Sequence, residues 1–130
     1  MKFALAVHGS PYGTTAQQHA LAFARACLAE GHQVYRVFFY HDGVYAGLAT
    51  RVAPQDEGDV TSDWQALASE HGVELAVCIA NALKRGVVNE GERDRYELTS
   101  ANLAEGFELV GLGQLIEAIA EADRYVEFPA

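Results

Sequence analysis

Cysteine is scarce in this sequence of 130 residues, which contains only Cys27 and Cys78. Neither residue belongs to a Cys-x-x-Cys pair or to the Cys/His spacing of a metal site. The sequence therefore excludes a thioredoxin-type dithiol and predicts neither a metal nor an organic cofactor. Two reduced thiols are typical of an intracellular protein, so we expect a cytoplasmic location.

Basic residues are also few, because 9 Lys and Arg stand against 18 Asp and Glu, for a formal net charge of -9. Proteins that bind nucleic acids draw much of their affinity from Lys and Arg side chains that neutralise phosphates. We therefore expect no direct binding to nucleic acid. Any RNA in the biology of this chain is expected to be handled by a partner.

Long apolar runs are missing as well. No stretch approaches the roughly 20 apolar residues of a membrane-spanning helix. The apolar run at residues 2–8 is short and is typical of a first strand, not of a signal peptide. We expect no association with a membrane.

What the sequence does contain is the composition of a globular protein, with 50% hydrophobic and 21% charged residues. Its length predicts one domain over residues 1–130. Strands are expected at 2–8, 33–40, 74–79, 107–110 and 125–128. Helices are expected from Thr14 or Thr15 to about Glu30, and at 60–71, 81–85 and 113–122. Residues 44–58 are expected to form a loop with at most one weak helical turn, and residues 87–100 a charged segment that includes a mobile loop. This alternation predicts a three-layer α/β/α fold with a mainly parallel sheet of about five strands.

Cys78 is the candidate for nucleophilic chemistry, because it lies at the expected carboxyl end of a central strand and just before a helix. Sites collect at that end of parallel sheets, and a helix N-terminus favours a thiolate. Lys84 and Arg85 follow and add positive charge, while His8 and His41 at other strand ends could help to deprotonate the thiol. The alternative is an inert, buried thiol, and that interpretation also explains Cys27 on an apolar helical stripe.

Two glycine-containing stretches could bind phosphate at a helix start. The loop at residues 8–15 follows the first strand, but it lacks a Walker or dinucleotide motif, and Pro11 removes one N–H donor. In the second stretch, at residues 111–116, Ile116 stands where a dinucleotide motif needs glycine. A structural turn is the simpler interpretation of both.

The chain resembles the DsrE/TusD family of sulfur-relay proteins over nearly its whole length. The order and spacing of several short stretches carry the resemblance: Tyr12–Thr14, Val37–Tyr40, Asp42–Tyr45, Val77–Val88, Asn102–Leu103, Gly106–Phe107 and Gly111–Leu115. The first and third stretches are closer to the TusD branch than to the DsrE branch.

The resemblance implies a sulfurtransferase in which Cys78 carries sulfane sulfur as a persulfide. It implies a TusA-like donor, a TusE-like acceptor, a heterohexamer with TusB- and TusC-like subunits, and 2-thiolation of the wobble uridine of tRNA. The alternative within the family is relay to a DsrC-like acceptor in sulfur oxidation. Persulfide transfer needs an accessible, ionisable thiol, so we expect Cys78 to be exposed toward a partner.

Two other classes of function stay open. A flavodoxin-like protein would bind a small ligand at the loop of residues 8–15. A non-catalytic interaction subunit would keep the fold without needing Cys78.

Overall fold

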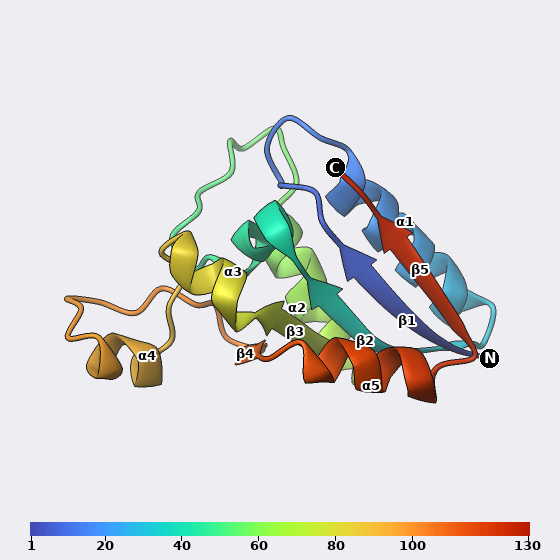
Figure 1. Ribbon diagram of the computed structural model, residues 1–130. Coiled ribbons are helices and arrows are strands. Elements are labelled where there is room, and N and C mark those ends of the chain that lie inside the picture. The colour runs from blue at the N-terminus through green and yellow to red at the C-terminus, as the bar shows by residue number, and fades with distance from the viewer.

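Five parallel strands form one sheet in the computed structural model, which describes residues 1–130. The spatial order is β4-β3-β2-β1-β5, and every neighbouring pair is parallel. The strands are β1 (Lys2–Val7), β2 (Gln33–Phe39), β3 (Glu74–Cys78), β4 (Phe107–Val110) and β5 (Arg124–Phe128). Their carboxyl ends share one edge of the sheet (Figure 1).

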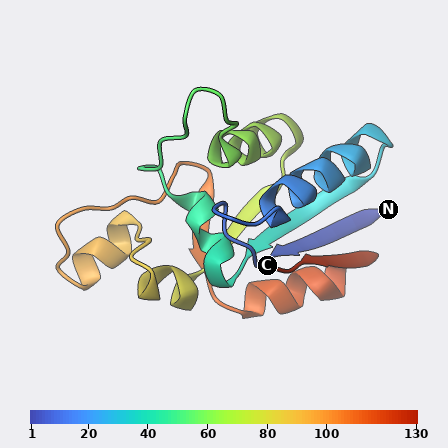
Figure 2. The same ribbon diagram turned by 90° about the horizontal axis from the view of Figure 1, so that it is seen from above.

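Helices cover both faces of this sheet. Helices α1 (Ala16–Ala29) and α2 (Val60–His71) pack on one face, and α5 (Gly113–Glu121) lies on the other (Figure 2). A 3-10 helix, η1 (His41–Gly47), and the short helices α3 (Ile79–Lys84) and α4 (Glu90–Arg95) follow β2 and β3. The predicted α/β/α class with a five-stranded parallel sheet is confirmed.

The two faces of the sheet have different cores, because successive strand residues point to opposite sides. A cluster of 23 buried residues fills the space beneath α1 and α2, and it includes Val37, Phe39 and Trp64. On the α5 face the buried cluster contains only Phe38, Ala76 and Cys78. The face that carries Cys78 is therefore the less deeply covered one.

The expected strands and helices are present, and residues 87–100 contain one helix that was not predicted. The helix over Val60–His71 is confirmed at both ends, with Gly72 in the left-handed conformation at φ 68°. The charged segment expected to include a loop also contains α4, whose N-terminus is capped by the Asn89 side chain accepting from the Glu92 N–H. Helix α4 buries none of its residues, so no apolar periodicity signals it.

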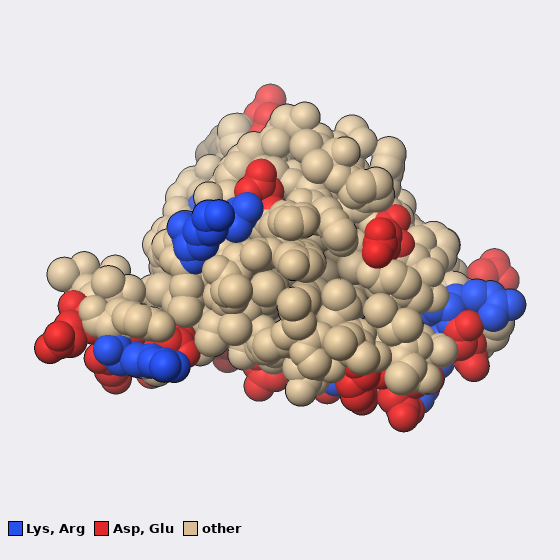
Figure 3. Space-filling model, in the orientation of Figure 1, with Lys and Arg blue, Asp and Glu red and all other residues tan.

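The α5 face also carries an apolar surface. Leu112, Ile116 and Ile119 are exposed, and their spacing places them on one side of the helix. Figure 3 shows a broad central area of this face, above α5, that is almost free of Lys, Arg, Asp and Glu. No helix combines the length and the apolar character needed to cross a bilayer.

Candidate functional site

Cys78 is the last residue of β3 and directly precedes α3, as the sequence predicts. Its exposure differs from the prediction, since the residue is only 2% exposed. Tyr40, Val110 and Leu115 pack against the cluster that contains it. Tyr40 directly follows β2, Val110 ends β4 and Leu115 lies in α5. The residues that pack around the thiol cluster therefore come from distant parts of the chain.

Cys27 occupies a different environment. It lies in α1, is 6% exposed, and belongs to the large core cluster. Burial raises the pKa of its thiol above the ordinary value, and the N-terminal ammonium only partly offsets this. A thiol with a raised pKa is a poor nucleophile at neutral pH.

The structure brings the two candidate histidines together. The ring centroids of His8 and His41 are 5.5 Å apart, at the carboxyl ends of β1 and β2. His41 also stacks on Tyr40 at 4.3 Å between centroids. Because Tyr40 packs against the Cys78 cluster, its ring links the histidine pair to the thiol's surroundings.

The basic residues after Cys78 are placed differently from the prediction. The Arg85 Nε donates to Asp42 Oδ1 at 2.8 Å, so its charge is matched by a carboxylate of η1. Lys84 lines a separate hollow together with Leu83 and Tyr96. The carboxylate of Asp42 thus offsets the charge of Arg85, and positive potential at Cys78 from Lys84 and Arg85 stays a prediction.

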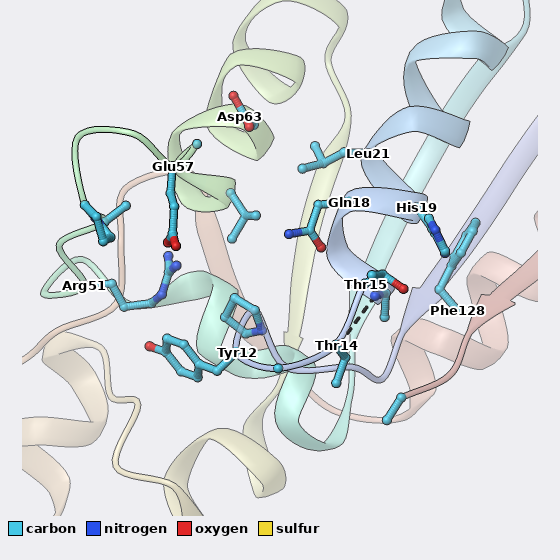
Figure 4. Close-up of a pocket in the computed structure, with 18 of the residues that line it drawn as sticks. Tyr12, Thr14, Thr15, Gln18, His19, Leu21, Arg51, Glu57, Asp63 and Phe128 are labelled. Atoms are coloured by element: carbon cyan, nitrogen blue, oxygen red, sulfur yellow. Dashed lines mark hydrogen bonds between the residues drawn. The ribbon is translucent and has the colours of Figure 1, made fainter.

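A second candidate site is a cavity of about 1210 Å³ on the α1–α2 side (Figure 4). The loop of residues 11–15, the segment of residues 51–54 and the residues that end β5 all line it. Strand order reverses between β1 and β5, and such switch points are common ligand sites in parallel sheets. The loop predicted to be a structural turn or a phosphate site thus borders a real cavity, on the opposite side of the sheet from Cys78.

Arg51 is one of two cations that line this cavity, and Arg25 is the other. The Arg51 Nη1 donates to Thr61 Oγ1 at 2.8 Å, and its guanidinium lies 5.4 Å from the centroid of the Tyr12 ring. Figure 4 shows the Glu57 carboxylate pointing toward it. Burial opposes ionisation of the nearby Asp59, but hydrogen bonds from Ser62 and Thr61 lower its pKa overall.

The second glycine-containing stretch has a structural role. Leu112 precedes α5 and Gly113 begins it, so residues 111–116 form a helix start, as expected. Across the whole chain, no three His, Cys, Asp or Glu side chains gather as metal ligands would.

The contacts that Tyr40, Asp42 and Asn81 make around Cys78 and η1 were not predicted from the sequence. Asp42 pairs with Arg85, and the Asn81 Oδ1 accepts from the backbone N–H of His41. These contacts join segments about 40 residues apart in the chain, so no local pattern could reveal them. The only sequence signal was that Asn81 and Arg85 are four residues apart and so share one side of a helix.

Comparison with known proteins places this chain in a family. Residues 1–128 match the DsrE/DsrF-like family. The crystal structure of the ychN protein from E. coli superimposes with a TM-score of 0.78 at 22% identity, covering 98% of this chain and 99% of that one. That likeness confirms the fold.

Curated relatives are more similar in sequence. "Sulfurtransferase TusD" of Salmonella dublin is 50% identical over 129 residues, 98% of this chain and 100% of that protein. "Sulfurtransferase TusD homolog" of Vibrio parahaemolyticus is 47% identical over 128 residues, 98% of each chain. The counterpart in Enterobacter sp. is 49% identical over 128 residues, 98% of this chain and 100% of that protein.

The parallel α/β fold and these full-length relatives define a sulfurtransferase of a sulfur relay, as the sequence predicts. The chain belongs to the DsrE/DsrF-like family.

Proposed function

We propose that the chain relays sulfane sulfur as a persulfide on Cys78. The position of Cys78 carries this proposal, because it is the one of two cysteines that lies at the carboxyl edge of the sheet, away from the large core. Sites of parallel α/β proteins collect at that edge. The TusD names of the relatives support the same activity.

The transfer needs only thiol chemistry. The Cys78 thiolate attacks the outer sulfur of a donor persulfide, and a new S–S bond forms as the donor's S–S bond breaks. The donor leaves as a thiolate, so charge and atoms balance. The acceptor thiolate repeats the step on the Cys78 persulfide and regenerates the Cys78 thiolate.

The family resemblance supports a TusA-like donor, a TusE-like acceptor and 2-thiolation of the wobble uridine of tRNA. It also supports assembly with TusB- and TusC-like subunits in the cytoplasm, with residues 1–130 of this chain as a single DsrE/TusD-like domain. The nearly uncharged α5 face offers a surface for such subunits (Figure 3). A net charge of -9 leaves contact with RNA to another protein. A DsrC-like acceptor in sulfur oxidation is the alternative outcome of the same chemistry.

The test is persulfide transfer to two single-cysteine variants. Cys78→Ser and Cys27→Ala are incubated with a persulfidated TusA-like donor, and intact mass is measured for the addition of one sulfur atom. Cys27→Ala should gain the sulfur, and Cys78→Ser should gain none while its circular dichroism stays native. Sulfur on Cys78→Ser but not on Cys27→Ala would show that the site is assigned to the wrong cysteine.

A second candidate function is small-ligand binding in the cavity of Figure 4, favoured by its place at the switch point of the sheet. The purified protein is examined for a flavin absorption spectrum, and its thermal unfolding is measured with added flavin mononucleotide. A colourless protein whose unfolding temperature does not change with this nucleotide would reject the flavodoxin-like alternative. A shift lost in Arg51→Gln and kept in Arg93→Gln, outside the cavity, would support it.

A further inference from the structure

The burial of Cys78 blocks the access that a sulfur donor needs to its thiol. A donor sulfur must reach the Cys78 Sγ along the line of the S–S bond that breaks, but the residue is only 2% exposed. Phe38 and Ala76 lie within the sheet and cannot leave without unfolding it. Tyr40 is different, because it is only partly buried and stands after the last residue of β2, where η1 begins.

The start of η1 is tied to α3 by two polar contacts. The His41 backbone N–H donates to Asn81 Oδ1 at 2.5 Å, and Arg85 Nε donates to Asp42 Oδ1 at 2.8 Å. Asn81 and Arg85 are one helical turn apart and face the same side. Arg85 Nη1 also donates to the Asn81 carbonyl oxygen at 3.2 Å, which fixes the guanidinium beside η1. Both contacts hold the chain immediately after Tyr40.

The backbone between these contacts is strained. His41 has φ 47°, in the left-handed region that a residue with a Cβ adopts at a cost. Such a conformation persists only where surrounding contacts hold it. Tyr40 stacks on this residue, so the position of its ring depends on the strained turn. Loss of the contacts to α3 allows His41 to relax and removes one restraint on the Tyr40 ring, while the Tyr40 backbone N–H still donates to the Val7 carbonyl at 3.0 Å.

We propose that Asn81 and Arg85 are positioning residues that hold Tyr40 against the buried cluster that contains Cys78, and that release of their bonds to η1 opens the thiol to a sulfur donor or acceptor. The meaning of this opening for sulfur transfer rests on the proposed function. The opening itself is a property of the fold and can be measured without any sulfur donor.

The experiment measures alkylation of Cys78 by iodoacetamide in the full chain, with Cys27→Ala as background so that one thiol reacts. Asn81→Ala combined with Arg85→Gln should raise the alkylation rate about tenfold, because fewer bonds oppose local opening. Asp42→Asn removes the ion pair from the exposed side of η1 and should raise the rate about threefold. Arg85→Lys, which keeps the charge, should restore a rate within about twofold of the background.

Arg93→Gln is the matched control, because Arg93 pairs with Asp94 on α4 at 3.0 Å and makes no contact with η1. It should leave the alkylation rate unchanged. Urea unfolding of every variant separates local opening from global loss of stability. A rate within twofold of the background in the folded variant that combines Asn81→Ala with Arg85→Gln overturns the proposal, as does a rise in that variant that matches its fall in global stability.

The same variants distinguish this inference from the proposed function. The Cys27→Ala background is incubated with the persulfidated TusA-like donor in parallel. If alkylation accelerates as expected but Cys78 gains no sulfur, the relay assignment fails and the positioning role stands. If Cys78 gains sulfur but the alkylation rates do not change, the positioning role fails alone.

Discussion

Gln17 shows how a single polar residue organises the first loop. Its side chain is fully buried in α1, yet both ends of its amide are satisfied: Nε2 donates to the Gly9 carbonyl at 2.8 Å, and Oε1 accepts from Trp64 Nε1 at 2.9 Å. The amide thereby joins the loop after β1 to α2. Buried polar groups of this kind stabilise a fold only while every partner remains paired.

Replacement of this amide should be costly. Gln17→Leu leaves the Gly9 carbonyl and the Trp64 indole N–H unpaired, and we expect a loss of about 3 kcal/mol in the free energy of unfolding. The measurement is urea denaturation followed by far-UV circular dichroism. Gln18→Leu is the control on the exposed side of the same helix, with an expected change within about 0.5 kcal/mol. Equal effects of the two substitutions would contradict the bridging role of Gln17.

At the scale of elements, α5 is attached to the sheet by charge as well as by apolar contact. Arg36 of β2 is buried at the side chain, lies 2.8 Å from Glu117 and 2.9 Å from Glu74, and donates to the Gln114 carbonyl. Tyr35 donates a further hydrogen bond to Glu117 at 2.6 Å. The pKa of Glu117 is lowered, and the hydrogen bond from Tyr35 is the largest cause. Desolvation raises the pKa in opposition, and the hydrogen bond and charge of Arg36 lower it further.

The pH dependence of stability follows from the direction of this pKa shift. A carboxyl whose pKa is lower in the folded than in the unfolded chain stabilises the fold above its unfolded pKa of about 4.3. That contribution is lost as the pH falls through the folded pKa. We expect Glu117→Gln to lower the urea midpoint at pH 7 and to differ little from wild type near pH 3.

The control for this prediction is Glu121→Gln on the same helix, because Glu121 lies 3.8 Å from Lys2 in an exposed pair. It should change the midpoint less than Glu117→Gln at pH 7. A difference between wild type and Glu117→Gln that stays constant from pH 7 to pH 3 would contradict the assigned role of Glu117.

Local signals explain which elements could be predicted from the sequence. Helix α2 has apolar residues at helical spacing and a glycine stop at Gly72, and both ends were predicted correctly. The position of Cys78 at a strand end was predicted for the same reason. Its burial was not predicted, because the cover by Tyr40 and Leu115 depends on strand order and on the packing of α5, neither of which local patterns contain.

At the scale of the whole molecule, the two faces of the sheet offer different surfaces. The α1–α2 side carries the large core and the cavity of Figure 4, whereas the α5 side carries the nearly uncharged area of Figure 3. Exposed apolar patches rimmed by polar residues are typical of protein interfaces. Leu112, Ile116 and Ile119 extend this surface along α5.

We expect the chain to associate instead of remaining a stable monomer, with itself or with TusB- and TusC-like subunits. Light scattering coupled to size exclusion measures the mass in solution. Ile116→Glu combined with Ile119→Lys places charge on the apolar side of α5 and should reduce the assembled fraction at least tenfold. Val52→Lys is the control, because Val52 is 92% exposed far from α5. A monodisperse monomer at high concentration, with and without the partner subunits, would contradict the prediction.

The covered position of Cys78 has a consequence for the sulfur that it would carry. A persulfide exposed to solvent loses its outer sulfur to any small thiol that collides with it. In the buried cluster against which Tyr40 packs, the same sulfur would be shielded from small thiols such as glutathione, which make few contacts with the surface. A docking protein makes many more contacts and could displace the Tyr40 ring. Transfer of the outer sulfur would then require binding of a partner that fits this surface.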